Sequence, residues 1–346
     1  MAGIASLSIP GSALFLRVWR NGVCGGGIGR KESAVLSKDV LYFLQQCLNA
    51  VQVSSFYCLL AVAYVLLYGI TNRINLAFGA IAVWASYLAI GSVAVLSALT
   101  PLVMAAVVLL AIVHSLASTM LLGLVIERLV LRPLVQRVSL AMLIATIGLA
   151  IMLEEIMRLT QGNRDRWLSP LLGEPIELAR GDDFSVEITQ MRVIIIIAAL
   201  LLSAALILFM AKHRFGRQWR ACAQDLQMAA LCGVDIRSTL TLTAIIAAGY
   251  AAAAGTAIVL YYGNASFFIG ITIALKALLV AVIGGLSSIP GVLAGGFLLG
   301  FLESFWSAYF PANYRDVVTF AALIVMLIFR PQGLFAASMR ADHDRY

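Results

Sequence analysis

Long apolar runs with few charges recur along almost the whole chain and restrict it to one class of fold. Each run is close to the roughly 20 residues that a helix needs to cross a hydrocarbon core of about 30 Å. The runs are continuously apolar rather than alternating, which argues against a transmembrane β-barrel. We therefore predict an all-α, polytopic bundle of transmembrane helices. The approximate runs are 53–70, 74–98, 101–127, 138–160, 192–211, 239–262, 267–287, 290–310 and 316–330.

Composition supports a membrane protein without catalytic chemistry. The chain is 62% hydrophobic and 12% charged, whereas soluble domains are near half apolar and a quarter charged. The net charge of +7 does not indicate nucleic-acid binding, because the basic residues cluster at loop ends. No catalytic motif is present, and we predict no catalytic residue, cofactor or metal site. The cysteines lack CxxC spacing and are predicted to be small apolar residues: Cys24, Cys47, Cys58, Cys222 and Cys232.

Basic residues between the apolar runs predict which loops face the cytoplasm. The turn 128–137 and the residues from Arg330 onward are basic, and both are assigned to the cytoplasm. The loop 161–191 mixes acidic and basic residues, and it is assigned to the outside. The most prominent cytoplasmic segment is the basic island between two apolar runs, which carries Lys212, Arg214, Arg217, Arg220 and Arg237.

The island contains a candidate partner-binding helix. Residues Ala221 to Leu231 have an amphipathic pattern, and Gly233 follows them, as is typical of a helix end. A membrane domain that presents a small helix to the cytoplasm usually presents it to a partner. The pattern favours transport driven by another subunit.

The N-terminal region conflicts with a simple count of spans. Nine full spans with a cytoplasmic C-terminus put the N-terminus outside, whereas the basic residues of 1–38 favour the inside. A segment that enters and leaves on one side removes the conflict. The best candidate is 74–98, because the stretch 69–79 before it is polar and glycine-rich, and broken helices are tolerated when buried in protein or lining a cavity. We predict about eight spans plus one broken or re-entrant segment.

Three regions are expected along the chain. Residues 1–38 are rich in Gly, Ser and Arg, and we predict an N-terminal extension that is disordered or interfacial. A translation start assigned too far upstream would give the same pattern. Residues 39–335 form the transmembrane domain, and 336–346 form a cytoplasmic tail.

Two charges lie inside apolar runs, namely Lys276 and Glu303. Each costs about 2.5–3.5 kcal/mol near the bilayer centre on insertion scales, so both are expected to face the bundle interior or a partner. One interpretation is that they line a translocation path. The other, which we favour, is that they pair with each other or extend toward the membrane surface and only fix the packing of the helices. Gly284 and Gly285 also have two interpretations, which are close helix packing and a flexible turn at the cytoplasmic gate.

Four stretches in order carry a family resemblance. The sequence resembles the LivH-type permease subunits of ATP-binding cassette (ABC) importers for branched-chain amino acids, which include urea and amide permeases. The resemblance covers about 40–335. The stretches are FLQQCLNAVQVSSFYCLLAVAYVLLYGITNRINLAFGAIAV (43–83), RACAQDLQMAALCGVDIRSTLTLT (220–243), LKALLVAVIGGLSSIPGVLAGGFLLGFLES (275–304) and YRDVVTFAALIVMLIFRPQGLF (314–335).

The resemblance implies a set of partners and a location. These are a second permease subunit, two ATP-binding subunits, a periplasmic substrate-binding protein and the lipid of a bacterial inner membrane. It also implies site residues. The ATPase-coupling loop contains Arg220, Ala223, Asp225, Ala229, Gly233 and Asp235. The matching segment near the first spans contains Asn75, Phe78 and Gly79, although the histidine of the family's NFAHG-type string is absent.

Two other functions stay open at this point. A secondary transporter or channel that works alone would need coupling-ion sites, for which only Lys276 and Glu303 are available. A sugar-type permease of a related architecture is a further alternative, but the ending RPQGLF and the string RACAQD favour the amino acid and urea group. The sequence does not identify the solute.

Overall fold

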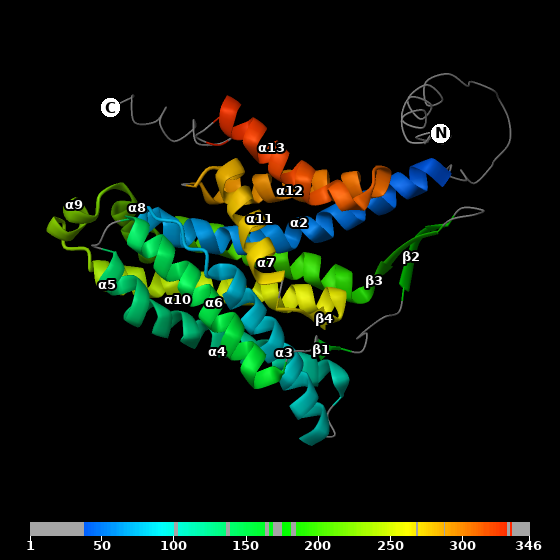
Figure 1. The fold of residues 1–346 in the computed structure, drawn as a ribbon, viewed down its shortest axis with the longest axis horizontal. Helices are drawn as coiled ribbons and strands as arrows, with labels where there is room; N and C mark the ends of the chain where they lie inside the picture. Colours follow the sequence, from blue (N-terminus) through cyan, green and yellow to red (C-terminus); the bar gives the residue numbers. More distant parts are fainter. Residues whose placement is uncertain are drawn as a thin grey trace, which may run out of the picture.

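The structure is a computed structural model in which long helices pack into one bundle (Figure 1). The predicted extension 1–38, apart from Lys38, and the predicted tail 336–346 lie outside the described residues. The structure describes residues 38–99, 103–135, 139–162, 166–168, 175–180, 185–267, 269–286, 288–330 and 333.

Among these residues, eight helical segments are long and apolar enough to cross a membrane, which makes the chain a multi-pass membrane protein. The segments are α2 (Lys38–Thr71), α3 (Phe78–Leu99), α4 (Met104–Ile126) with the π-helical turn η1 (Glu127–Leu131) and α5 (Arg132–Leu134), α6 (Ser139–Gln161), α7 (Gln190–Lys212), α10 (Ile236–Tyr262), α12 (Ile289–Tyr309), and the 3-10 turn η2 (Ala312–Tyr314) with α13 (Arg315–Phe329). The prediction of about eight spans is confirmed.

The prediction that 74–98 is a broken or re-entrant segment is wrong. Residues 74–98 do not form a broken helix, because α3 is continuous over its 22 residues. The polar stretch before it stays outside the helix, where Asn72 has a positive φ of 50° and Asn75 Oδ1 accepts a hydrogen bond from Ala77 N at 2.9 Å. Besides the eight long segments, the described residues include a shorter apolar helix, α11 (Ile269–Gly284). Its 16 residues span about 24 Å at 1.5 Å per residue. It crosses its neighbours steeply in Figure 1.

Contacts with distant segments fix the direction of α2 in the bundle. The first turns of α2 lie beside the loop 161–191, where Gln45 Nε2 donates to the carbonyl of Glu187 at 3.1 Å. The last turns of α2 lie at the opposite end, where the carbonyl of Leu66 accepts from Trp219 Nε1. These two ends are called the outer end and the inner end. The long helices then alternate in direction along the chain, so α3 returns to the outer end, where Tyr87 donates to the carbonyl of Ala265, and does not re-enter (Figure 1).

The outer end also carries four short strands, which the all-α prediction did not include. β2 (Pro175–Arg180) and β3 (Ser185–Thr189) form an antiparallel hairpin. Val186 and Ile188 are buried while Glu187 is exposed, so β3 has the period of two that a half-buried strand requires. β1 (Arg166–Trp167) pairs with β4 (Asn264–Ala265) and ties the same loop to the end of α10.

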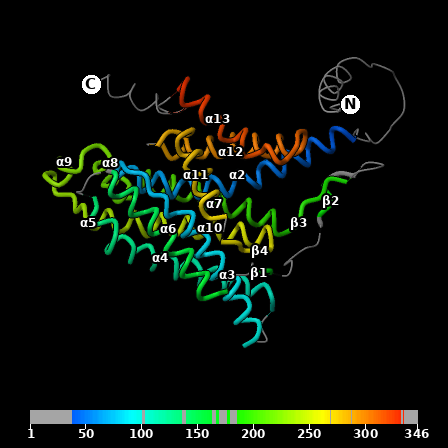
Figure 2. The backbone as a smooth tube through the Cα atoms, in the orientation of Figure 1, coloured from blue at the N-terminus to red at the C-terminus, as the bar shows by residue number. Residues whose placement is uncertain are grey.

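Helix α2 lies in the centre of the bundle, packed against α10, α11 and α12 (Figure 2). Small residues permit this close packing. Gly296 and Gly300 of α12 lie directly against Cys58 and Ser54 of α2, with no room for a side chain. The central helices are therefore mostly buried, whereas α4, α7 and α13 lie at the periphery and expose apolar faces suited to lipid or to a partner.

Candidate functional site

The basic island at the inner end forms two helices instead of the single one predicted for Ala221 to Leu231. They are α8 (Arg214–Gln224) and α9 (Leu226–Leu231). Asp225 separates them with an extended backbone, and its Oδ1 accepts hydrogen bonds from Gln227 N at 2.7 Å and Met228 N at 3.1 Å. Aspartate in this position caps a new helix, and that local bond ends α8 early.

Helix α8 is attached to two transmembrane helices. Trp219 is buried and donates from Nε1 to the carbonyl of Leu66 in α2 at 3.0 Å. Its ring fills the space beside Gly69, where a Cβ atom would collide with it. Arg220 Nη1 donates to the carbonyl of Met210 near the end of α7 at 2.8 Å. A displacement of α8 is thus transmitted to α2 and α7.

Helix α9 exposes apolar side chains at the inner end of the bundle, where Figure 1 shows it projecting. Within this fully described helix, Ala229 alone is buried, while Met228 is 59% and Leu231 81% exposed. Gly233 ends the helix with a φ of +83°, and the amide of Val234 donates to the carbonyl of Ala229 at 3.0 Å. Exposed apolar residues on a short, capped helix form a compact surface for a partner.

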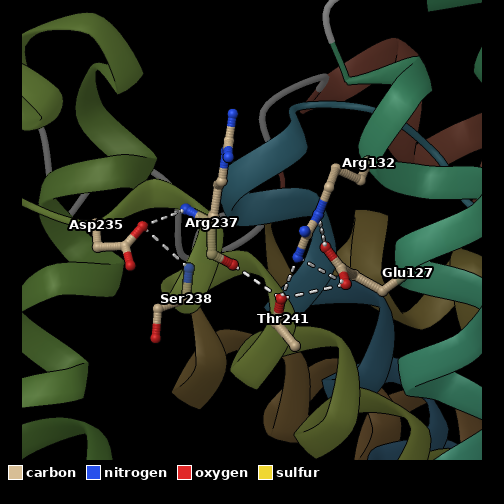
Figure 3. Close-up of polar contacts among 6 residues, drawn as sticks. All are labelled: Glu127, Arg132, Asp235, Arg237, Ser238 and Thr241. Atoms are coloured by element: carbon tan, nitrogen blue, oxygen red, sulfur yellow. Dashed lines mark hydrogen bonds and ion pairs between the residues drawn. The ribbon is translucent and has the colours of Figure 1, made fainter.

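The next residue of the predicted coupling loop, Asp235, begins α10. Its Oδ1 accepts hydrogen bonds from the amides of Arg237 at 3.0 Å and Ser238 at 3.3 Å (Figure 3). Ala223 is exposed and lines the inner cleft described below. The six predicted loop residues are therefore brought together around α9, as two helix caps, two small helix residues, one helix-ending glycine and one arginine that holds α7. Their role in coupling remains a prediction.

One turn further along α10, a buried carboxylate connects that helix to α4. Glu127 is fully buried in η1, and Arg132 contacts it through Nε to Oε1 at 3.1 Å and Nη2 to Oε2 at 3.3 Å. The hydroxyl of Thr241 accepts from Arg132 Nη2 at 2.8 Å and lies 3.2 Å from Glu127 Oε2 (Figure 3). We call these three residues the Glu127 cluster.

Sequence reasoning missed the Glu127 cluster for a geometric reason. Residues five apart point in different directions on an α-helix, where only i,i+3 and i,i+4 pairs are neighbours. The π-helical turn widens the helix to an i→i+5 pattern and brings Arg132 over Glu127. The only signal available was a carboxylate in an otherwise basic turn.

A cleft of about 540 Å³ opens at the inner end between α8, the ends of α2 and α7, and the turn from α11 to α12. Gly285 forms that turn with a φ of +98°, and Gly284 packs directly on the backbone of Gly291 and Val292. The two predicted gate residues therefore divide between the two interpretations: Gly284 serves close packing and Gly285 serves a turn. A gating role for them stays a prediction.

The other predicted path residues near α3 are buried and packed. The ring of Phe78 lies 5.1 Å from the ring of Tyr64 on α2. Gly79 sits against the backbone of Gly270 and permits α3 to approach α11. Asn75 serves the local turn before α3. These contacts suit packing, and a place on the translocation path stays a prediction for these three residues.

Lys276 and Glu303 do form the predicted pair, with Nζ 2.9 Å from Oε1. The pair belongs to a larger group that sequence reasoning did not find. Lys276 Nζ also lies 2.8 Å from Asp316 Oδ1, Arg315 Nε lies 2.9 Å from Glu303 Oε1, and Tyr57 donates to Glu303 Oε2 at 2.6 Å. These five residues, from α2, α11, α12 and α13, are called the outer charge cluster because Arg315 and Asp316 begin α13 at the outer end.

Comparison with known families identifies the kind of protein that carries this arrangement. The family model described as "Branched-chain amino acid transport system / permease component" matches residues 46–327. The chain belongs to this permease family.

Individual relatives agree with the family. The chain is 38% identical over 299 residues to the high-affinity branched-chain amino acid transport system permease protein LivH of Escherichia coli K12, covering 86% of this chain and 97% of LivH. It is 36% identical over 300 residues to BraD, a permease protein of the same description from Pseudomonas aeruginosa, covering 86% and 96%. A probable LivH permease of Methanocaldococcus jannaschii is 26% identical over 142 residues, covering 39% and 45%. No solved structure matches the chain significantly.

Proposed function

We propose that this permease is the translocation subunit of an ABC importer for branched-chain amino acids in a bacterial inner membrane. ATP is hydrolysed by two separate ATP-binding subunits, a second permease subunit completes the pore, and a periplasmic binding protein delivers the solute. The proposal rests on the family and on one observation in the structure, which is the exposed α9 held between α8 and α10 at the inner end.

The contacts suggest how the ATP-binding subunits act. They dock on the exposed residues of α9, and their closure displaces α8 and α9 together. Through Trp219 the displacement reaches α2, and through Asp235 it reaches α10 and the Glu127 cluster. ATP and the loaded binding protein stabilise different arrangements of the bundle, and that difference drives the alternation between inward-open and outward-open states.

Gly233→Arg tests this assignment. Arginine fits the open space around Gly233 but is strained at its φ of +83° and places a charge on the docking surface. We expect the variant to insert normally and to lose both uptake and co-purification of the ATP-binding subunits. Gly162→Arg is the matched control, because Gly162 has a φ of +84° and open surroundings but lies at the outer end. This control is expected to retain the ATP-binding subunits.

Two results would oppose the proposal. ATP-binding subunits that remain bound and coupled in Gly233→Arg would show that α9 is not their docking site. A chain that is purified intact from its own membrane without ATP-binding subunits, and that still transports an amino acid in liposomes, would instead be a secondary transporter. In that case the outer charge cluster would be the first place to look for a coupling-ion site.

A further inference from the structure

The outer charge cluster contains two cations and two anions in a buried and an exposed layer. Lys276 and Glu303 form the buried layer, with side chains only 4% and 6% exposed. Arg315 and Asp316 form the exposed layer, with side chains 44% and 49% exposed. The cluster is neutral in total charge, yet it presents one charge of each sign toward its open side.

The charged groups of the exposed layer can bind a further partner besides the buried layer. Arg315 Nε lies 2.9 Å from Glu303 Oε1 and 3.7 Å from Asp316 Oδ1. Asp316 reaches Lys276 through Oδ1. The side chains of Arg315 and Asp316 stay accessible beside these contacts, at 44% and 49% exposure.

Packing alone does not account for the charges of the exposed layer. One Lys276–Glu303 pair already neutralises both buried charges, and Tyr57 satisfies the second oxygen of Glu303. Two further charges at the start of a peripheral apolar helix are costly beside lipid, so they are expected to face water or a partner instead. The guanidinium of arginine presents two parallel N–H groups that match a carboxylate, and a free carboxylate oxygen accepts from an ammonium group.

We propose that Arg315 and Asp316 bind the two charged poles of a zwitterionic α-amino acid as it enters the permease from the outer end. The solute carboxylate lies on the terminal nitrogens of Arg315, and its ammonium group lies on Asp316. This inference rests on the proposed import function and deepens it. Urea and amides carry neither charge, so the site favours amino acids over the neutral solutes that the family resemblance leaves open.

The importer itself provides the test, reconstituted in proteoliposomes as both permeases with the ATP-binding subunits. Leucine uptake and ATPase stimulation are measured with saturating, leucine-loaded binding protein. Arg315→Lys keeps the charge but removes the planar fork. We expect uptake to fall at least tenfold while ATPase stimulation stays within twofold of the parent, because lysine keeps the positive charge beside Glu303 and the contact of α2 with Glu303 through Tyr57 remains. Arg330→Lys, at the inner end of the same helix, is the matched control and should change neither quantity.

Selectivity provides a second readout. The poles of leucine, isoleucine and valine are the same, so Arg315→Lys should lower the uptake of all three by the same factor. Asp316→Asn removes the partner of the ammonium group at constant size and should give the same pattern as Arg315→Lys.

Each remaining outcome decides the proposal. Uptake within twofold of the parent in both variants would overturn it. A parallel loss of uptake and ATPase stimulation would assign the residues to coupling, and failure of both variants to assemble would assign them to folding; either result overturns the binding role. A parent complex that hydrolyses ATP but imports no amino acid would contradict the proposed function itself, before any variant is compared.

Discussion

The Glu127 cluster allows a prediction whose order of effects follows from burial. Glu127 is fully buried, whereas the side chain of Arg132 is 39% exposed. Arg132→Met leaves a buried carboxylate whose remaining partner is the hydroxyl of Thr241. Removing one partner of a buried pair costs about 3–5 kcal/mol, and the exposed side of this pair places the cost near 3 kcal/mol. We expect Arg132→Met to lower the free energy of unfolding by about that amount.

The reverse substitution is expected to be milder. Glu127→Gln leaves Arg132, which can hydrate through its exposed side, and the amide retains a hydrogen bond to Thr241. The expected loss is about 1 kcal/mol, the size of a typical hydrogen-bond change. Glu127→Met combined with Arg132→Met removes both charges together. Apolar replacement of a buried pair is often neutral, so the double variant should be more stable than Arg132→Met alone.

Thermal unfolding in detergent, followed by tryptophan fluorescence, measures this order. At about 2 °C per kcal/mol for a large chain, Arg132→Met should melt about 6 °C below the parent and Glu127→Gln about 2 °C below it. The reasoning is refuted if Glu127→Gln is the more destabilised of the two. It is also refuted if the double variant loses the sum of the two single losses, because the charges would then be independent.

Two further predictions concern packing and exposure. Gly255→Val should lower the free energy of unfolding by about 3 kcal/mol or more and reduce the yield of folded protein, because Gly255 lies against the α3 backbone with no room for a Cβ atom. Gly91→Val is the control. Gly91 faces open space, so this substitution should change neither quantity. A membrane-impermeant maleimide added on the cytoplasmic side should modify Cys232 and spare Cys222, because Cys232 is exposed while burial raises the pKa of the Cys222 thiol. Peptide mapping measures which of the two thiols is modified. Equal modification of both thiols would contradict the packing of α8, and bound ATP-binding subunits should protect Cys232.

The membrane architecture was predictable from the sequence because it depends on one strong physical requirement. Every apolar run must satisfy its backbone hydrogen bonds inside the bilayer, and a helix does so within a single segment. The positions of the spans followed directly. The pair of Lys276 and Glu303 was predictable for a similar reason, because two opposite charges inside apolar helices are stabilised by finding each other.

Residues that act through tertiary contacts were not predictable in this way. Arg315 and Asp316 look like ordinary charges at the start of a span until α11 and α12 are placed beside them. Tyr57 looks like one more apolar position within α2 until Glu303 lies opposite it. The re-entrant assignment of 74–98 failed because local polarity shows where a helix starts but not which end of the bundle the chain reaches next.

Helix α2 links the two candidate sites, and its composition restricts how they can communicate. Tyr57 contacts Glu303 of the outer charge cluster, and the carbonyl of Leu66 holds Trp219 of α8. The residues between them include no glycine or proline, and kinks in helices occur almost always at such residues or at inserted groups. This part of α2 therefore has no hinge at which one end could move without the other. A displacement of α8 large enough to shift Leu66 must also shift Tyr57 against Glu303, so closure at the inner end and the geometry of the outer charge cluster are mechanically coupled within this single chain.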